Sequence, residues 1–144
     1  MATKSVAVVS SVVLMSGWLG LASTGEAHHA FSSEFDATRP VVLSGTITRV
    51  ELINPHSWLH LDVTQEDGTV ESWMIEAGPP GVLVRRGWTR DSVQPGTEVM
   101  VEGYQARDGS NRANGRDVTL PDGTRLFAGS TGVGAPPPDA APIQ

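Results

Sequence analysis

An all-β domain with one short helix is the fold class that this sequence predicts. Short segments rich in β-branched residues recur between turn signals, and apolar and polar side chains alternate along several of them, as they do in half-buried strands. Only one segment, shortly after residue 78, has the start and stop signals of a helix. A chain of 144 residues can form one modest core and is too short for two.

Three strands are expected first, as a meander. Val41–Glu51 is dense in Val, Ile and Thr, and Trp58–Val63 alternates apolar with polar positions. The Asp67-Gly68 dipeptide is a strong signal for a two-residue hairpin turn. Thr69–Glu76 is therefore predicted to be the third strand, antiparallel to the second.

A short helix is expected after the meander. A Gly-Pro-Pro-Gly run at residues 78–81 leads into Val82–Arg86, and Gly87 follows directly. Proline near the first helical position and glycine just past the end are typical helix boundaries. One helix is thus predicted to interrupt the strands.

The remaining strands are expected between residues 97 and 127. Thr97–Tyr104 alternates apolar and polar residues, whereas Arg107–Gly115 is polar and glycine-bearing and is predicted to be a loop. Arg116–Leu120 and Arg125–Phe127 flank a second Asp-Gly dipeptide and would form the last strand or a closing hairpin. The resulting order, β-β-β-α-β-β, is that of the OB-fold, so we expect a small OB-fold-like five-stranded barrel.

The first 27 residues are predicted to be a secretory signal peptide. Lys4 gives a small positive start, residues 6–21 are apolar apart from scattered Ser and Gly, and Gly-Glu-Ala at residues 25–27 fits the small-x-small cleavage rule. Gly-Leu-Ala at residues 20–22 fits it as well. An uncleaved anchor is the other alternative, but Ser and Gly dilute the segment and no basic stop-transfer cluster follows it.

Cleavage after Ala27 would leave residues 28–128 as the barrel domain and residues 129–144 as a tail. The tail consists almost entirely of Gly, Ala, Pro and polar residues, so we expect it to be disordered. The mature protein would be periplasmic or secreted, with no stable membrane insertion.

Composition excludes several kinds of site. The chain has no Cys, which removes disulfides, thiolate metal sites and cysteine nucleophiles. Its formal net charge is −6, and no Lys follows Lys4, whereas nucleic-acid phosphates are held by clustered Lys and Arg. Nucleic acid is therefore not an expected partner, and any bound metal must use nitrogen, oxygen or thioether donors.

The four histidines, His28, His29, His56 and His60, all lie in the first 60 residues. If cleavage follows Ala27, His28 offers a free α-amine and an imidazole, and a second imidazole would complete a three-nitrogen set of the kind that copper favours. Each histidine also has a simpler explanation, as a flexible terminal residue, a loop imidazole or a surface position on a strand.

Spacing favours one combination of these donors. Four residues of strand span about 13 Å, so His56 and His60 can share one ion only if the chain bends sharply between them. We therefore favour His28 with His56, the amine of His28 as third donor, and His29 or His60 as alternates. Copper is the first candidate and zinc the second. Four carboxylates could complete the shell: Glu34, Asp36, Glu51 and Glu76.

Several segments resemble a family of small exported bacterial proteins of unknown function. They are His28-His29-Ala30-Phe31, Asn54-Pro55-His56-Ser57-Trp58, Leu83-Val84-Arg85-Arg86-Gly87-Trp88, and Asp108-Gly109-Ser110 through Val118-Thr119-Leu120-Pro121-Asp122-Gly123. The resemblance covers nearly the whole mature chain but not the tail. It implies an exported compartment and a role for the paired-histidine start and the Asn-Pro-His turn, and it implies nothing about a substrate.

Two functions remain from different classes. The first is a periplasmic metal-binding protein, carrying or buffering copper or serving as an accessory to a copper or redox enzyme. The second is a non-catalytic OB-like module that docks onto another exported protein. An oxygen-activating copper enzyme has less support, since no substrate-reading surface is evident and no nucleophile elbow occurs for a hydrolase. No catalytic residue is predicted.

Overall fold

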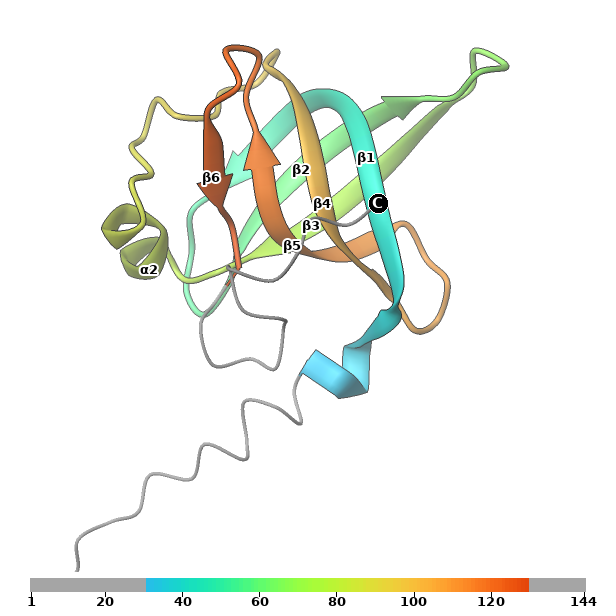
Figure 1. Ribbon diagram of the computed structural model, residues 1–144, viewed down its shortest axis with the longest axis horizontal. Helices are drawn as coiled ribbons and strands as arrows, with labels where there is room; N and C mark the ends of the chain where they lie inside the picture. Colours follow the sequence, from blue (N-terminus) through green and yellow to red (C-terminus); the bar gives the residue numbers. More distant parts are fainter. Residues whose placement is uncertain (1–30, 130–144) are drawn as a thin grey trace, which may run out of the picture.

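The computed structural model describes residues 31–129, so the predicted signal peptide, His28, His29 and residues 130–144 of the predicted tail lie outside the described residues. A single helical turn at residues 31–34 leads into the strands (Figure 1). The elements that follow are β1 (Phe35–Glu51), β2 (Ser57–Thr64), β3 (Val70–Ala77), α2 (Pro80–Arg85), β4 (Glu98–Ala106), β5 (Arg112–Thr119) and β6 (Arg125–Phe127). No helix within residues 31–129 is long and apolar enough to cross a bilayer.

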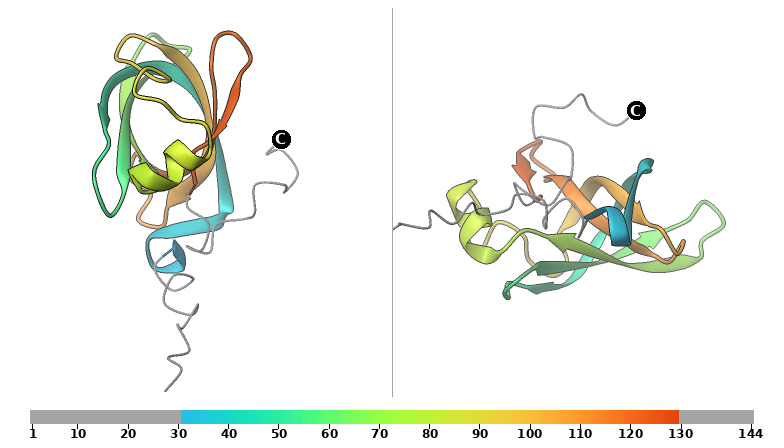
Figure 2. Two further views of the ribbon diagram at one scale, coloured as in Figure 1. Left: turned by 90° about the vertical axis from the view of Figure 1, so that its left-hand side faces the viewer. Right: turned by 90° about the horizontal axis from the view of Figure 1, so that it is seen from below.

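The strands form one sheet in the order β3-β2-β1-β4-β5-β6. All of these neighbours are antiparallel, and a further parallel pairing between β3 and β5 closes a ring of hydrogen bonds. Figure 2 shows the ring end-on, with α2 at one end. The architecture is therefore mostly β and barrel-like, and the predicted OB-fold-like class with its helix between the third and fourth strands is confirmed. The short β6 extends the sheet beyond β5.

The main core fills the inside of the ring. Leu59, Leu61 and Ile75 from β2 and β3 are fully buried, and α2 contributes Leu83. Trp88, just after the helix, is buried as well and donates its indole N–H to the carbonyl oxygen of Phe127 at 2.9 Å. The helix and the loop after it are thereby held against one end of the barrel.

Two glycines allow neighbouring strands to approach closely where they bend. A Cβ on Gly45 of β1 would lie 2.3 Å from the carbonyl oxygen of Asp62, and a Cβ on Gly103 of β4 would lie 2.3 Å from the carbonyl oxygen of Asn114. No side chain fits at that distance, so glycine is required at both positions. Without these bends β1 and β4 could not curve around the ring.

A second, smaller apolar cluster holds the N-terminal segment against the barrel. Phe31 is only 5% exposed, and its ring lies 6.0 Å from that of Tyr104 on β4 in an edge-to-face arrangement and 5.9 Å from that of Phe35. The side chain of Arg107 donates to the carbonyl oxygen of Ser32 at 2.6 Å. The chain therefore enters the described fold at a fixed place on the barrel.

The sequence prediction was wrong on the number and extent of the strands: the sheet has six strands where five were expected, and β1 begins at Phe35 where Val41 was expected. Residues 112–115, expected to end a loop, form the first half of β5. Asn114 pairs with Glu76 of β3 on one side and with Tyr104 of β4 on the other. Because strand formation depends on such partners more than on intrinsic preference, a polar segment poor in β-branched residues is drawn into the sheet.

Candidate functional site

His56 and Glu76 meet on the outer side of the barrel. His56 ends the β1–β2 loop, and its Nδ1 lies 3.2 Å from Oε1 of Glu76 on β3. Asn114 of β5 donates its side-chain N–H to the same oxygen at 3.2 Å. Strand register explains the grouping, because Glu76 is the direct partner of Trp58 on one side and of Asn114 on the other.

The carboxyl group of Glu76 is largely removed from solvent, with the residue 8% exposed. Burial raises its pKa, the nearby carboxylate of Glu34 acts in the same direction, and His56, Asn114 and Arg112 oppose the shift. A buried carboxylate is stable only with partners: Asn114 donates a hydrogen bond to Glu76, and His56 interacts with the carboxylate electrostatically. The contact thus places a ring nitrogen of His56 beside a buried carboxylate oxygen of Glu76.

A small cavity of about 170 Å³ opens beside this pair. Its wall includes Phe31, His56, Trp58, Glu76 and Asn114. The side-chain oxygen of Asn114 is buried and accepts no hydrogen bond within residues 31–129. Buried polar atoms rarely stay unpaired, so this oxygen is an acceptor for which the described residues supply no donor.

Arg112 ties the N-terminal segment to the barrel at the edge of the cavity. Its guanidinium lies 3.1 Å from a carboxylate oxygen of Glu34, 5.9 Å from the ring centre of Phe35 and 5.6 Å from that of Trp58. These contacts combine an ion pair with cation–π attraction. Together with the burial of Phe31, they keep residues 31–35 next to His56.

His60 belongs to a different contact. On β2, its Nε2 lies 2.8 Å from Oε2 of Glu51, and Arg49 forms an ion pair with the other oxygen of the same carboxylate. The two described histidines therefore bind different carboxylates through different ring nitrogens. Within residues 31–129, no three or more His, Asp or Glu side chains are grouped so that they could hold a metal.

The predicted donors are thus only partly brought together. The small cavity is lined by three of them, His56, Glu76 and Glu34, whereas Glu51 contacts His60. Asp36 is exposed to solvent and hydrogen-bonded to Thr38, at 2.7 Å between the two side chains. His28 and His29 lie outside the described residues.

Residues 17–115 match a family of unknown function, DUF6152. The chain belongs to this family. The expected membership of an uncharacterised family is thereby confirmed, whereas export and the individual motifs remain predictions. No curated protein and no solved structure gave a match.

The DUF6152 match includes the whole contact group around the cavity, from Phe31 to Asn114. Sequence reasoning missed two members of the group, Arg112 and Asn114, because it assigned them to a loop. The Asn-Gly dipeptide at residues 114 and 115 also reads locally as a turn signal rather than a strand. No local sequence pattern therefore identifies Arg112 and Asn114 as members of the candidate site.

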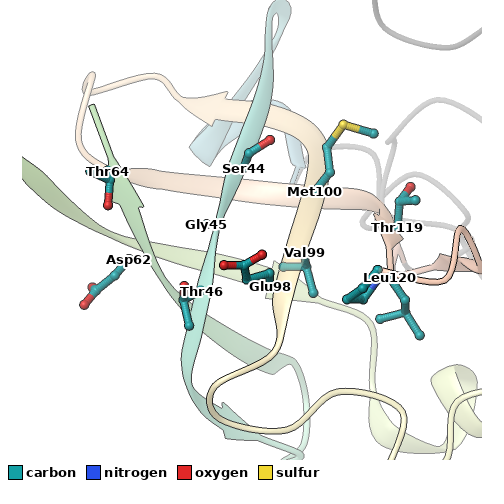
Figure 3. A pocket seen from close by; sticks show the side chains of 11 residues that line it. Ser44, Gly45, Thr46, Asp62, Thr64, Glu98, Val99, Met100, Thr119 and Leu120 are labelled. Atoms are coloured by element: carbon teal, nitrogen blue, oxygen red, sulfur yellow. The ribbon is translucent and has the colours of Figure 1, made fainter. Parts of the chain in front are cut away.

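A larger groove of about 600 Å³ lies elsewhere, around Gly45 of β1 (Figure 3). Its lining contains no histidine and is equally polar and apolar. The polar side chains are Ser44, Thr46, Thr64, Thr119, Asp62 and Glu98, and the apolar ones are Val99, Met100, Leu120 and Pro121. Unlike the cavity beside His56, its lining includes no buried side-chain atom without a hydrogen-bond partner. Of these two cavities, only the smaller one is lined by a histidine and by a residue with a buried acceptor that lacks a hydrogen-bond partner within the described residues.

Proposed function

We propose that this member of the DUF6152 family binds a transition metal in an exported compartment, as a carrier or accessory protein. Copper(II) is the first candidate and zinc the second. The proposed donors are an imidazole nitrogen of His56 and the α-amine and imidazole of His28, with His29 as an alternate. The observation that carries the proposal is the contact between His56 and the buried Glu76.

The contact with Glu76 orients the ring of His56 so that it could bind a metal ion. Nδ1 faces the carboxylate of Glu76, so Nε2 is the ring nitrogen available to a metal. Metal-bound histidines commonly donate their second ring N–H to a carboxylate, which orients the ring and raises its basicity. The side chain of His56 is 31% exposed, so an ion can reach it.

Chain connectivity brings the other donors within reach. Phe31 is buried and lines the same cavity as His56. His28 precedes Phe31 by three residues, and three extended residues span at most about 11 Å. A short tether of this kind gives the terminal donors a high effective concentration at His56.

The unpaired oxygen of Asn114 supports the same proposal. It is a buried acceptor on a residue that lines the cavity, and the described residues offer it no donor. An α-amine or a metal-bound water would supply the missing N–H or O–H. The absence of Cys in the chain and the abundance of nitrogen donors near residue 28 favour Cu(II), which also ranks highest in divalent affinity.

A docking module is the second candidate. Leu52 and Ile53 are 41% and 51% exposed at the tip of the loop that leads to His56. Exposed apolar side chains on a loop are suited to contact with another protein. In this alternative the loop would contact another exported protein, and His56 would bind no metal.

Cu(II) titration of the exported protein tests the proposal. The full chain is produced with its own leader, and intact mass first establishes that it begins at His28. Isothermal titration should then give one tight Cu(II) per chain. A matched protein with one extra residue before His28 should bind at least tenfold more weakly, because its amine is displaced. Equal affinity in both proteins would overturn the three-nitrogen site, and absence of tight binding in both would favour the docking module.

A further inference from the structure

His60 and Met74 are direct partners across β2 and β3 on the outer side of the barrel. Their chain neighbours Leu59, Leu61 and Ile75 are completely buried, so the alternation of side chains puts His60 and Met74 on the opposite face. Residues directly opposite in an antiparallel pair have Cβ atoms about 4.5–5.5 Å apart. The imidazole and the thioether can therefore meet at one point.

Both side chains are accessible at that point. The side chain of His60 is 21% exposed, and Met74 is 37% exposed. Met74 contributes to neither apolar cluster of the described residues. Met74 thus adds little to the core, and its side chain is partly open to solvent.

His60 is already oriented by a carboxylate. Its Nε2 lies 2.8 Å from Oε2 of Glu51, which is also paired with Arg49. When Nε2–H is donated to Glu51, the lone pair lies on Nδ1, the nitrogen that a metal would use.

We propose that His60 and Met74 form a second metal site, separate from the site at His56, and that it binds Cu(I). Thioether sulfur is a soft donor that selects Cu(I) over Cu(II) and zinc, and imidazole suits copper as well. His56 contacts Glu76, which lies in the adjacent outward-facing row beside Trp58. The two sites are therefore neighbours with different donors.

The charges around the pair are compatible with one added positive charge. Arg112 is the partner of Met74 on the β5 side, but its guanidinium is paired with Glu34. Arg49 on the β1 side is paired with Glu51. Each arginine is thus paired with a carboxylate, which reduces its repulsion of a cation bound between His60 and Met74. A protein with both sites would hold copper in either oxidation state.

Anaerobic Cu(I) titration of the exported full chain, with bicinchoninate as a competing chelator, tests this site. Met74→Leu should weaken Cu(I) binding at least tenfold, and so should His60→Ala. Met100→Leu is the matched control, because Met100 is 38% exposed, as Met74 is, but its cross-strand partners are Ser44 and Thr119. This control should bind Cu(I) like the wild type.

Two results would overturn the inference. One is wild-type Cu(I) affinity in Met74→Leu. The other is loss of Cu(I) only when His28 and His29 are replaced by alanine, which would assign the ion to the terminus. Met74→Leu conserves volume on an exposed face, so its melting temperature should match that of wild type. It should also keep its Cu(II) affinity, which separates this test from that of the three-nitrogen site.

Oxidation of methionine gives an independent readout. With Ag(I) as a redox-inert substitute for Cu(I), hydrogen peroxide should convert Met74 to the sulfoxide at least tenfold more slowly than in the free protein. Met100 in the same molecule should be oxidised at an unchanged rate, as measured by peptide mass spectrometry. Equal oxidation of Met74 with and without Ag(I) would contradict the site.

Discussion

The imidazole of His56 and the buried carboxylate of Glu76 are joined by a single contact, Nδ1 to Oε1 at 3.2 Å. The two residues are 20 positions apart in the chain and come together because β2 and β3 form a hairpin in which Ser57 pairs with Ala77. Because Nδ1 faces Glu76, Nε2 is the ring nitrogen of His56 that a metal ion could bind.

Replacing His56 by alanine should weaken Cu(II) binding at least tenfold. One of three nitrogen donors is lost, and a factor of ten corresponds to only about 1.4 kcal/mol. His60→Ala is the matched control and should have a smaller effect on Cu(II), because His60 contacts Glu51 and does not line the cavity beside His56. Isothermal titration at two pH values checks both variants, and affinity should fall at the lower pH as protons compete for nitrogen. Wild-type affinity in His56→Ala would leave only adventitious chelation at the terminus.

Glu76→Gln should change how stability depends on pH. Burial raises the pKa of Glu76 in the folded state above its ordinary value of 4.5. The stability linked to this carboxyl is therefore fully present below pH 4.5 and decreases as pH rises through the folded-state pKa. The stability of Glu76→Gln relative to wild type should consequently increase with pH over that window, as measured by urea unfolding. A difference that is constant with pH would show that Glu76 titrates normally.

The same variant should weaken Cu(II) binding by about tenfold to a hundredfold. A glutamine cannot take the proton of His56 or orient the ring as a carboxylate does, and loss of such an outer partner typically has this effect on metal affinity. Glu71→Gln serves as the control, because Glu71 is a half-buried carboxylate on the same strand that contacts Gln65 and Trp73 instead of a histidine. Equal Cu(II) affinity in the two variants would count against His56 as a ligand.

Phe31→Ala should destabilise the fold and weaken Cu(II) binding together. Truncating a buried aromatic side chain costs about 3–5 kcal/mol in a core, and we expect the lower end because Phe31 belongs to the small outer cluster. The terminal donors would then be released from the neighbourhood of His56. Phe31→Leu should retain most of both properties. Unchanged Cu(II) affinity in a clearly destabilised Phe31→Ala would show that the tether does not matter for binding.

Gly103→Ala should destabilise the protein by more than about 2 kcal/mol, since its Cβ would meet the backbone oxygen of Asn114 at 2.3 Å. Gly81→Ala in α2 is the control: its Cβ meets only the end of the Arg85 side chain at 3.5 Å, and alanine favours helix by about 0.5–1 kcal/mol. Chemical unfolding of both variants gives the comparison. A tolerated alanine at position 103 would mean that β4 and β5 can separate at low cost.

The fold could be predicted from the sequence where local signals determine pairing. Hairpins form at both Asp-Gly dipeptides, as expected, and they connect β2 to β3 and β5 to β6. The turns are longer than the predicted two residues: Gly68 donates to the carbonyl oxygen of Gln65, Gly123 donates to that of Leu120, and only the glycines have positive φ. Residues 112–115 could not be recognised as a strand, because their partners lie on β3 and β4, far away in the sequence.

The candidate site was predictable to a similar extent. His56 and Glu76 were both candidate donors, but their contact depends on hairpin register, which composition does not reveal. Asn114 could not be found, since it reaches Glu76 only through the parallel β3–β5 pairing. Phe31 could not be recognised as buried, because its partner Tyr104 comes from β4.

The parallel pairing of β3 with β5 also has a consequence for the order of folding. Hairpins such as β2–β3 can form early because their contacts are local, whereas joining Glu76 to Asn114, 38 residues later, requires closure of a long segment. Until that closure, the carboxylate of Glu76 lacks the amide that helps to hold it beside His56. Under the proposed function, copper would therefore bind only to molecules in which the pairing of β3 with β5 has already formed.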